Sequence, residues 1–581
     1  MDMIKIKRRS IPETDVQLPN ALHPVLRNIY LARQVSGQGE LEHTLGQLIP
    51  YSQLKGIEVA VAVLFDALQR QHSILIIGDF DADGATSTAL AMRVLKEFGA
   101  QHVDFLVPNR FAYGYGLTPE IVEVAAERRP DLIITVDNGI SSLAGVALAR
   151  EKGIDVLVTD HHLPAEQLPN ANAIVNPNQP EDLFPSKHLA GVGVIFYLMM
   201  ALRVHLREQD WFVQQGIKEP NLANHLDLVA LGTVADVVVL DHNNRILVAQ
   251  GLARIRAGAC CVGIKALLEI GHRQLRNIVA ADLGFCVAPR LNAAGRLEDM
   301  SIGIACLLSE SEIEARALAQ QLDELNHDRR AIEQGMREQA FAYIDSLDLG
   351  DEGHLPVALC LREDDWHEGV IGIVAARVKE KFHRPVIAFA LSGEGVDALL
   401  KGSARSVSGL HIRDALDTVA VKHPGLIIKF GGHAMAAGLT IKQEDYEAFQ
   451  QAFIEEVARH LGEDDLQGII LSDGVLPATD LNLGMAEQLR QAGPWGQGFP
   501  EPIFDGVFEL VNRRIVGEKH LKLVIRSAET AQTIDAIAFN QVDASWPAMV
   551  NQVLLAYRLD VNEFRGSRNA QMIVEHIEPM P

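Results

Sequence analysis

The sequence predicts a multi-domain α/β protein, in which two α/β domains are joined by a long helix and followed by an all-β domain. Short β-branched segments alternate with helical segments near 73–160 and again near 355–430. A charged stretch without Pro separates these two regions, and short strands with frequent turns fill the end of the chain. The 581 residues leave room for three or four domains at roughly 100–200 residues each.

Composition excludes several classes of protein. With 48% hydrophobic and 22% charged residues, the chain is neither disordered nor of low complexity. The 52 Lys and Arg against 76 Asp and Glu give a net charge of −24, which argues against a protein that coats nucleic acid through a basic surface. Any nucleic-acid site must therefore be a local basic groove or a metal site.

The cysteines and the apolar segments predict a cytoplasmic protein that does not enter a membrane. The five Cys have no CxxC spacing, so a disulfide framework or a thiolate zinc site is not expected. The basic start lacks the apolar stretch of a signal peptide. The longest apolar run, 192–202, is shorter than the about 20 residues that span a bilayer.

The first 350 residues are expected to form three parts, of which two precede residue 241. Residues 1–70 form a docking segment that contains one amphipathic helix around Leu54–Leu68. Residues 71–240 form a domain whose apolar strands alternate with helices, which indicates a parallel sheet covered on both faces. Its strands are expected at 73–78, 102–108, 132–137 and 154–160.

Residues 241–350 form a helical region that ends in a long connecting helix over 310–345, about 50 Å if unbroken. A coiled coil is the alternative, but heptads are not sustained. A second α/β domain follows at 351–461, with strands at 355–360, 385–390 and 425–430. Residues 467–581 predict a barrel with strands around 508–517, 520–527, 535–540 and 552–564.

Acidic and imidazole side chains follow three of the four strands predicted for the first sheet. The carboxyl ends of parallel strands meet at one edge, where open sheets bind their ligands. We therefore expect the side chains that follow these strands to converge in one crevice, namely Asp79, Asp81, Asp83, Asp137, Asp160, His161 and His162.

So many carboxylates require a counter-charge, because each acid resists ionisation beside the others. Oxygen ligands suit Mg²⁺ or Mn²⁺, and imidazoles favour Mn²⁺. Asp137 could bridge two ions about 3.5–4 Å apart, as in displacement at phosphorus. Calcium is a weaker alternative, since the twelfth position of an EF-hand loop would be Leu90 rather than Glu. Each Asp taken alone could also be a helix cap.

Four motifs resemble those of the DHH phosphoesterase superfamily: DFDADG (79–84), TVDNGI (135–140), TDHHLP (159–164) and ALGTVADVVVL (230–240). Further segments resemble the bacterial members of this superfamily that are exonucleases specific for single-stranded DNA. These are PNRFAYGYGL (108–117), GVGVIFYL (191–198), APRLNAAGRL (288–297), WHEGVIGIVAAR (366–377), KGSARS (401–406) and FGGHAMAAG (430–438). The resemblance implies a DHH domain, a long connecting helix, a DHHA1 domain and an OB-fold.

Carried over position by position, the resemblance implies two divalent ions and a set of metal ligands in which Asp137 bridges: Asp81, Asp83, Asp137, His161 and Asp236. In more distant DHH phosphatases a His precedes the second motif aspartate by four residues, and here that place is Ile77. We expect Asp79 or another group to complete the coordination. His162 is expected to orient a ligand or to face the phosphate.

A second constellation lies at 377–430, where nine Lys and Arg against five Asp and Glu give a local charge of +4. Lys401, Gly402, Ser403 and Arg405 are suited to binding a phosphate through a hydroxyl, a guanidinium and exposed backbone N–H groups. A solvated turn is the alternative. Gly431, Gly432 and His433 follow the strand predicted at 425–430, and the resemblance implies that this loop contacts the substrate.

Other candidates for the substrate site lie in loops, and the resemblance implies that arginines of this kind hold a 5′-terminal phosphate: Arg110, Arg290, Asn292 and Arg296. Tyr113, Tyr115 and Trp366 could stack on bases or pack in a core. In the last domain, basic residues alternate with apolar ones and predict a face that follows a single-stranded backbone, or a solubilising face: Arg513, Arg514, Lys519, His520, Lys522 and Arg526.

Together these features predict a 5′→3′ exonuclease that releases 5′-mononucleotides from single-stranded DNA with two metal ions, in DNA repair and recombination. Two alternatives remain: a phosphodiesterase of short oligonucleotides or cyclic dinucleotides, and a catalytically silent scaffold. We expect a monomer that cooperates with a helicase and a single-strand-binding protein.

Overall fold

The computed structural model describes residues 4–13, 15–108, 116–346, 355–393, 398–542, 550–564 and 566–580. Contacts divide the chain into two compact units. The first unit combines residues 1–7 with 327–471, and the second combines 8–326 with 472–581.

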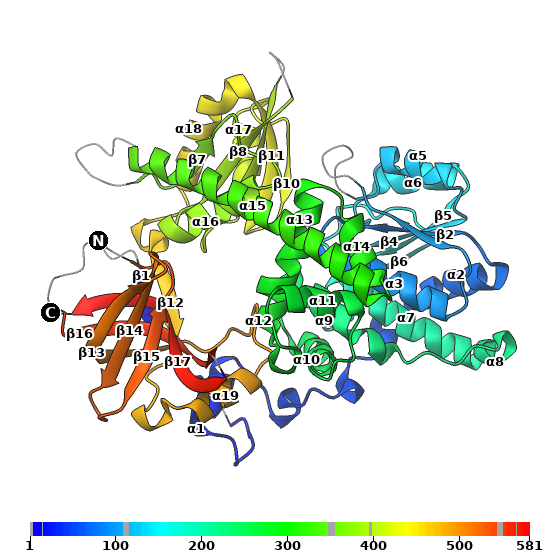
Figure 1. The fold of residues 1–581 in the computed structure, drawn as a ribbon. Coiled ribbons are helices and arrows are strands. Elements are labelled where there is room, and N and C mark those ends of the chain that lie inside the picture. Colours follow the sequence, from blue (N-terminus) through cyan, green and yellow to red (C-terminus); the bar gives the residue numbers. More distant parts are fainter. Residues whose placement is uncertain are drawn as a thin grey trace. The chain divides into compact units, whose positions relative to one another are not determined.

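The second unit contains a five-stranded parallel sheet in the order β3-β2-β4-β5-β6 (Figure 1). The four strands predicted for this sheet are confirmed, and the short β6 was not predicted. The strands are β2 (Ile74–Gly78), β3 (Val103–Leu106), β4 (Leu132–Val136), β5 (Asp155–Thr159) and β6 (Ala173–Val175). Every residue of β2 and β4 is buried, as expected for central parallel strands.

Helices cover both faces of this sheet because successive side chains of a strand point to opposite faces. Ile74 and Ile76 pack into a core with α3 (Ala82–Glu97) and α7 (Gly191–Glu208). Leu75 and Ile77 pack into a separate core with α5 (Pro119–Glu127) and α6 (Leu143–Glu151). The α3 and α7 layer also contacts α9 (Leu226–Ala235), which leads to Asp236.

A helical region connects this sheet to the first unit. It comprises α10 (His242–Arg256), α11 (Val262–Ile270), a π-helical turn η6 (Leu283–Val287), α13 (Ala288–Leu297) and α14 (Ser301–Leu308). The predicted connecting helix is confirmed as α15 (Glu312–Ser346). Leu322 of α15 belongs to the core of the second unit, whereas Met336, Ala340 and Ile344 belong to a core of the first.

The segment before the first sheet packs within the second unit. It contains α1 (Pro24–Ala32) and the predicted amphipathic helix, which is α2 (Ile57–Arg70). Ile57, Val61 and Leu64 of α2 are buried. Arg33, after α1, forms a buried ion pair with Asp473, which precedes the barrel.

The first unit contains a five-stranded mixed sheet in the order β10-β11-β9-β8-β7, packed with α16 (Ile371–Phe382), α17 (Ile412–Lys422) and α18 (Tyr446–Val457). Its strands are β7 (Leu359–Arg362), β8 (Val386–Ser392), β9 (Leu399–Arg405), β10 (Lys429–Gly432) and β11 (Ala436–Lys442).

Two expectations for this sheet are wrong. The strand predicted at 425–430 begins only at Lys429, because residues 423–428 form turns and bends, from which Leu426 and Ile427 pack against the core while Ile428 is exposed. The segment from Lys401 to Arg405 is not a turn with exposed N–H groups: it lies in β9, which pairs with β8 on one side and β11 on the other.

The last domain is a closed barrel in the order β13-β14-β15-β17-β16, which confirms the predicted all-β domain. Its strands are β13 (Phe504–Val516), β14 (His520–Ser527), β15 (Thr533–Ala538), β16 (Gln552–Phe564) and β17 (Ser567–Met580). The helix α19 (Leu483–Gln491) packs on β16. Before it, β12 (Gly468–Ser472) pairs with β1 (Ile4–Arg8).

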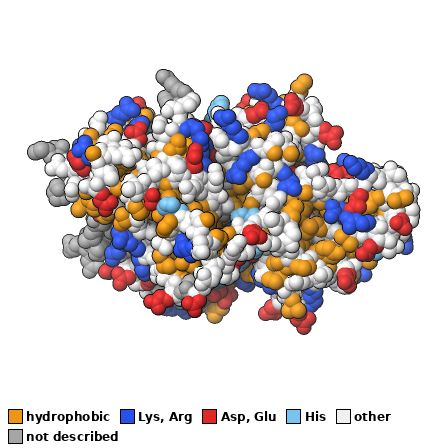
Figure 2. Space-filling view, turned by 90° about the horizontal axis from the view of Figure 1, so that it is seen from below, with side chains coloured by type: hydrophobic (Ala, Val, Ile, Leu, Met, Phe, Trp, Pro, Cys, Tyr) orange, Lys and Arg blue, Asp and Glu red, His pale blue; other side chains and the backbone are white. Residues whose placement is uncertain are grey.

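Charged side chains of both signs are interspersed on the face shown in Figure 2, with no single broad basic surface. No single helix among the described residues is long and apolar enough to cross a membrane; the bent pair Leu45–Gln53 and Ile57–Arg70 reaches that length and composition only together.

Candidate metal centre and phosphate site

The carboxylates predicted from the sequence lie at the carboxyl edge of the parallel sheet. Asp79 follows β2, Asp137 follows β4, and the Asp160-His161-His162 segment follows β5. Asp236 joins them from the end of α9. The chain thus brings together acids and histidines that are up to 157 positions apart, from Asp79 to Asp236.

The ligand atoms form three overlapping groups, each with its atoms within 4.8 Å of one another: Asp79 with Asp81 and Asp137, Asp83 with His161 and Asp236, and Asp137 with His161 and His162. His161 Nε2 lies 3.0 Å from Asp137 Oδ1 and 3.4 Å from Asp236 Oδ2. Asp137 belongs to the first and third of these groups, and His161 belongs to the second and third. These two residues therefore link the three groups into one cluster. This arrangement is suited to two neighbouring cations, with Asp137 at the junction.

Backbone N–H groups hold two of these aspartates. Asp81 is the N-cap of α3, where its Oδ1 accepts hydrogen bonds from the N–H groups of Asp83 and Gly84. The Asp83 carboxylate accepts hydrogen bonds from Gly191 N and Val192 N, at 2.6 and 3.0 Å. These two N–H groups belong to the first turn of α7, where the helix dipole stabilises negative charge.

Gly191 is required by close packing on Asp137. A Cβ at Gly191 would lie 2.6 Å from the Asp137 Cβ and 2.8 Å from its Oδ1. Any side chain there would displace Asp137. The role of this glycine could not be predicted from the sequence, although the GVG segment is part of the resemblance.

Two non-glycine residues at the centre have left-handed backbone conformations. Asp137 has φ of 63°, and Val237, directly after Asp236, has φ of 59°. A β-branched residue in this region is strained, and such strain concentrates at functional sites.

Asp160 organises the two histidines rather than joining the donor groups. It is buried, its Oδ1 lies 2.7 Å from His162 Nδ1, and it also accepts hydrogen bonds from the N–H groups of His161 and His162. Burial opposes ionisation of Asp160, but its bonds to His162 keep the pKa of Asp160 below the usual value. Burial alone would lower the pKa of His162, but the pair with Asp160 raises it to about 9.

The other carboxylates resist ionisation in the metal-free protein. Burial and neighbouring acids raise the pKa values of Asp79, Asp137 and Asp236 well above the usual value. Burial and Asp81 also raise the pKa of Asp83, to about 7, despite the N–H groups of α7. A buried set of oxygen donors with two imidazoles and unfavourable mutual repulsion fits hard divalent cations such as Mg²⁺ or Mn²⁺.

The phosphate-binding residues predicted on β9 share one face of their strand. Lys401, Ser403 and Arg405 are partly exposed, whereas the residues between them are buried. Lys401 pairs with Glu368 at 2.8 Å. Arg405 donates hydrogen bonds to the Ser403 hydroxyl and the Ala404 carbonyl.

Arg405 has no carboxylate within ion-pair distance among the described residues, and burial lowers its pKa. Its guanidinium approaches the first turn of α16, since a Cβ on Gly372 would lie 2.9 Å from Arg405 Nη2 and from Ser403 Oγ. A partly buried guanidinium beside a hydroxyl and without an acidic partner is suited to an anionic ligand.

Gly431 and Gly432 end the edge strand β10, and His433 lies in the turn to β11, where its N–H donates to the Ala436 carbonyl. Gly432 has φ of 145°, and a Cβ there would lie 2.5 Å from the Ala436 carbonyl oxygen. Open space surrounds the position of a Cβ on Gly431. The glycines therefore belong to the strand and do not follow it as predicted.

Two of the candidates on α13, Arg290 and Asn292, form hydrogen bonds to other parts of the second unit. Arg290 is buried and donates to Asp323 of α15 and to the Cys286 carbonyl. Asn292 accepts a hydrogen bond from the N–H of Ala82, which begins α3 between the candidate ligands Asp81 and Asp83. Arg296 is partly exposed in the last turn of α13. A contact of these residues with substrate stays a prediction.

Arg110, Tyr113 and Tyr115 lie outside the described residues. Trp366 is buried and donates to Gln339, so it packs in a core and cannot stack on a base there.

The predicted alternation is seen in part of β14, where Leu521 and Leu523 are buried on either side of the partly exposed Lys522. Val524 is partly exposed rather than buried, and the buried position there is Ile525. Lys522 pairs with Asp535, and Arg526 pairs with Glu509, so part of this basic face is neutralised. Arg513, Arg514 and Lys519 are exposed at the β13–β14 hairpin, where Ile515 is 57% exposed and not buried.

Three known domain families match the parallel-sheet domain, the mixed-sheet domain and the barrel. Residues 73–233 match the DHH family N-terminal domain, residues 354–459 match the DHHA1 domain, and residues 472–576 match the RecJ OB domain.

Whole-chain relatives are found among curated proteins and solved structures. The chain is 54% identical to the single-stranded-DNA-specific exonuclease RecJ of Dickeya dadantii and 53% identical to that of Escherichia coli, in each case over 99% of both chains. A crystal structure of Thermus thermophilus RecJ in complex with Mn²⁺ matches with a TM-score of 0.78 and 30% identity, covering 96% of this chain and 76% of that chain. The chain therefore belongs to the RecJ family.

Proposed function

We propose that this protein is a 5′→3′ exonuclease that cleaves single-stranded DNA and releases 5′-mononucleotides. The donor cluster in which Asp137 and His161 connect two ligand groups carries this function. The RecJ relatives are named for single-stranded-DNA-specific exonuclease activity, and solved RecJ structures contain Mn²⁺ or Mg²⁺.

Two divalent cations would be held by Asp79, Asp81, Asp83, Asp137, His161 and Asp236. When bound, Mn²⁺ or Mg²⁺ ions supply Lewis acidity for water activation and for stabilisation of charge on the phosphodiester. Asp81 and Asp83 are fixed by backbone N–H groups, which keeps their remaining oxygen lone pairs oriented. The Asp160 carboxylate lies 2.7 Å from His162 Nδ1 and orients this ring, so that its other nitrogen can face the cations or the phosphate.

Ser403 and Arg405 would bind the 5′-terminal phosphate. The partly buried guanidinium of Arg405 has no carboxylate partner in the described part of the chain, so a phosphate would supply the missing charge. We assign cleavage to residues 71–240, recognition of the strand end to 351–461, and further strand contacts to the barrel at 467–581. The loop of Gly431, Gly432 and His433 is assigned to the substrate as well.

We further propose that the protein acts as a monomer in the cytoplasm, in DNA repair and recombination. A helicase would supply single strands, and a single-strand-binding protein would keep them open. The net charge of −24 supports local rather than general binding of DNA, which leaves strand capture dependent on such partners.

One assay tests the proposed activity. Single strands with a 5′-phosphate and either a 5′ or a 3′ label are incubated with Mn²⁺, Mg²⁺ or EDTA. We expect the 5′ label to appear at once as a mononucleotide, the 3′-labelled strand to shorten gradually, and EDTA to stop both. Cleavage limited to di- to tetranucleotides or cyclic dinucleotides would favour the phosphodiesterase, and absence of cleavage with bound metal would favour a scaffold.

A further inference from the structure

The two histidines that follow β5 lie beyond the end of the strand, where side chains take over the hydrogen bonds of their backbone. The N–H groups of His161 and His162 both donate to the carboxylate of Asp160. The side-chain amide of Asn178 donates to the His161 carbonyl at 2.6 Å, and that of Asn176 donates to the His162 carbonyl at 2.9 Å. Three side chains therefore satisfy the N–H and the carbonyl of both histidines.

The short strand β6 brings the two asparagines to this position. It ends in register with β5, so Asn176 comes directly after β6 where Asp160 comes directly after β5. Asn176 is fully buried and uses both ends of its amide, because its Oδ1 accepts the N–H of Asn178 while its Nδ2 donates to His162. The pairing of two parallel strands thus places the amide donors beside the carbonyls that need them.

The loop that carries the asparagines, residues 176–188, is anchored by Asp182. The carboxylate of Asp182 is buried and pairs with Lys187 at 2.8 Å. It also accepts the N–H of Lys55, in the segment before the first sheet. The Lys187 carbonyl in turn accepts a second hydrogen bond from the amide of Asn178. The asparagines therefore belong to a loop that is itself fixed from several directions.

The peptide between the two histidines is held through both of its polar groups. Its carbonyl accepts the amide of Asn178, and its N–H donates to Asp160. Rotation of this peptide would turn the imidazole of His161, whose Nε2 lies 3.0 Å from Asp137 Oδ1 and 3.4 Å from Asp236 Oδ2. The hydrogen bond from Asn178 thus fixes the direction from which His161 faces the other donors.

We propose that Asn176 and Asn178 are positioning residues of the metal centre, which orient His161 towards a divalent cation. The inference rests on the metal binding of the proposed function. The amides act on the backbone of the histidines, so neither asparagine needs to contact the cation. Partners that orient a metal ligand typically contribute 10- to 100-fold in metal affinity or activity. Loss of either amide should therefore weaken cation binding by about this factor.

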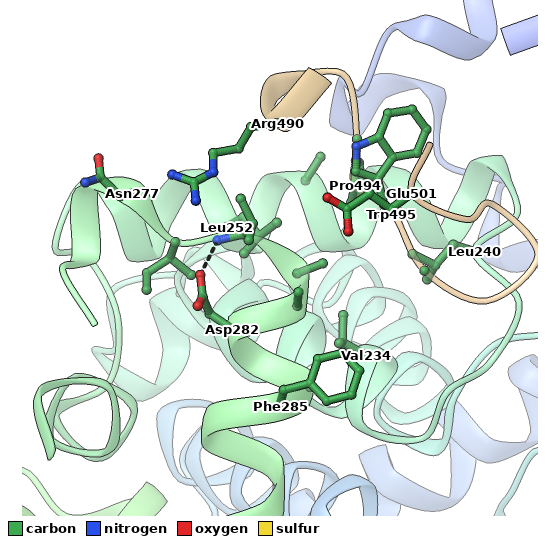
Figure 3. Close-up of a pocket in the computed structure, with 18 of the residues that line it drawn as sticks. Val234, Leu240, Leu252, Asn277, Asp282, Phe285, Arg490, Pro494, Trp495 and Glu501 are labelled. Atoms are coloured by element: carbon green, nitrogen blue, oxygen red, sulfur yellow. Dashed lines mark hydrogen bonds between the residues drawn. The ribbon is translucent and has the colours of Figure 1, made fainter. Parts of the chain in front are cut away.

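The large cavity of the second unit is formed by other segments. Its volume is about 900 Å³, and Val234, Phe285 and Trp495 are among the residues that line it (Figure 3). The loop 176–188, all of which the structure describes, contributes no residue to this lining. Substitution of the asparagines should therefore leave the cavity unchanged, and a loss of metal affinity would not be attributable to it.

Calorimetric titration with Mn²⁺ is the first test. Asn176→Ala and Asn178→Ala should each bind Mn²⁺ about 10- to 100-fold more weakly than the wild type. Asn172→Ala is the matched control, because the Asn172 side chain bonds Val156 N and Asp155 at the opposite end of β5. It should lower the melting temperature in EDTA but leave the affinity for Mn²⁺ unchanged.

A double-mutant cycle tests whether Asn178 acts through His161. His161→Ala removes one donor and should itself weaken the binding of Mn²⁺. If Asn178 acts by orienting His161, Asn178→Ala should cost little further affinity in the His161→Ala background. The absorption spectrum of bound Co²⁺ depends on the geometry of its ligands, so the spectrum of Asn178→Ala should shift towards that of His161→Ala.

Initial rates at saturating Mn²⁺ provide a third readout. Asn178→Ala should lower kcat and leave KM for a 5′-phosphorylated strand nearly unchanged, because the asparagine acts on a metal ligand. Asn178→Ser retains a shorter donor and replaces the alanine variant if that variant does not fold. It should lose less affinity for Mn²⁺ than Asn176→Ala.

Folded Asn176→Ala and Asn178→Ala proteins that bind Mn²⁺ as tightly as the wild type would overturn the inference. The same conclusion would follow from an equal loss of affinity in Asn172→Ala, since stability alone would then explain the effect. Full additivity of Asn178→Ala with His161→Ala would also overturn it. A wild-type protein that binds no Mn²⁺ would instead refute the proposed function.

Discussion

The side-chain oxygen of Asn292 accepts a 2.8 Å hydrogen bond from the backbone N–H of Ala82, 210 positions earlier in the chain. Ala82 lies between Asp81 and Asp83, so helix α13 holds the first turn of α3, which supplies two candidate ligands. This hydrogen bond therefore fixes the backbone between two candidate ligands of the metal centre.

Asn292→Ala should lower kcat and leave KM for a 5′-phosphorylated strand nearly unchanged. One hydrogen bond contributes about 0.5–1.5 kcal/mol, which corresponds to a roughly 2- to 13-fold effect. Initial rates over a range of strand concentrations check this. A change in KM alone would show that Asn292 binds substrate and does not act by supporting the first turn of α3.

Gly191→Ala should disable the metal centre, because the added methyl group would lie 2.6 Å from the Asp137 Cβ. Gly193→Ala on the same helix is the matched control, since its Cβ meets only the end of the Leu189 side chain at 3.0 Å. Calorimetric titration with Mn²⁺ should show weakened or lost binding for the first variant only. Equal binding by both variants would contradict the close packing of α7 on Asp137.

Mn²⁺ should raise the melting temperature more at pH 8 than at pH 6. Burial and Asp81 raise the pKa of Asp83 to about 7 in the metal-free fold, so the folded state keeps a proton that the unfolded chain has already released. Stability without metal therefore falls as the pH rises from about 4 towards 7, and cation binding removes this repulsion. Thermal melts with Mn²⁺ or EDTA at both pH values measure the difference. An equal or smaller increase at pH 8 would contradict it, and Asp83→Asn should reduce the difference.

Arg405→Ala should chiefly raise KM for strands with a 5′-phosphate. Loss of a charge-assisted hydrogen bond costs about 1.5–3 kcal/mol, or roughly 10- to 150-fold in affinity. Strands with a 5′-hydroxyl serve as the control and should be affected much less. An equal loss on both substrates would show that Arg405 does not bind the terminal phosphate.

The convergence of the candidate ligands could be predicted because these residues follow apolar strands, and the alternation of strands with helices indicates a parallel sheet. Asp79, Asp137 and His161 could be placed at one edge on this basis. Asp236 could not, since it ends a helix, and only the resemblance indicated it. Gly191 and Asn292 were harder to interpret, because their roles depend on contacts with Asp137 and Ala82 that no local pattern records.

The strands of the first unit were predicted less well. The segment Lys401–Arg405 contains glycine, serine and charged residues, which are typical of a turn, yet it is a central strand. A Cβ at Gly402 would lie 2.6 Å from Phe389 and Leu439 side-chain atoms, so tertiary packing explains the glycine. The apolar run 425–430 is mostly a turn, in which the neighbouring Leu426 and Ile427 both pack against a core while Ile428 is exposed.

The barrel shares a core with the parallel sheet, so its function cannot be tested by simple truncation. Removing residues after Gly468 would take away Asp473, the partner of the buried Arg33, and would expose a core that the barrel shares with the catalytic sheet. An uncompensated buried charge is strongly destabilising. Paired substitutions at the exposed Arg513 and Arg514 are the better test of strand binding, and they should make the salt slope shallower.

The most direct test of the metal centre is the cleavage rate of Asp137→Ala at saturating Mn²⁺ on a 5′-phosphorylated single strand. Asp137 belongs to two of the three donor groups, and the proposed bridging role predicts that its loss displaces both ions while it relieves repulsion among the remaining acids. We predict no measurable release of mononucleotide from a variant that melts at or above the temperature of the metal-free wild type. A folded variant that retained more than a tenth of the wild-type rate would contradict a bridging role for Asp137.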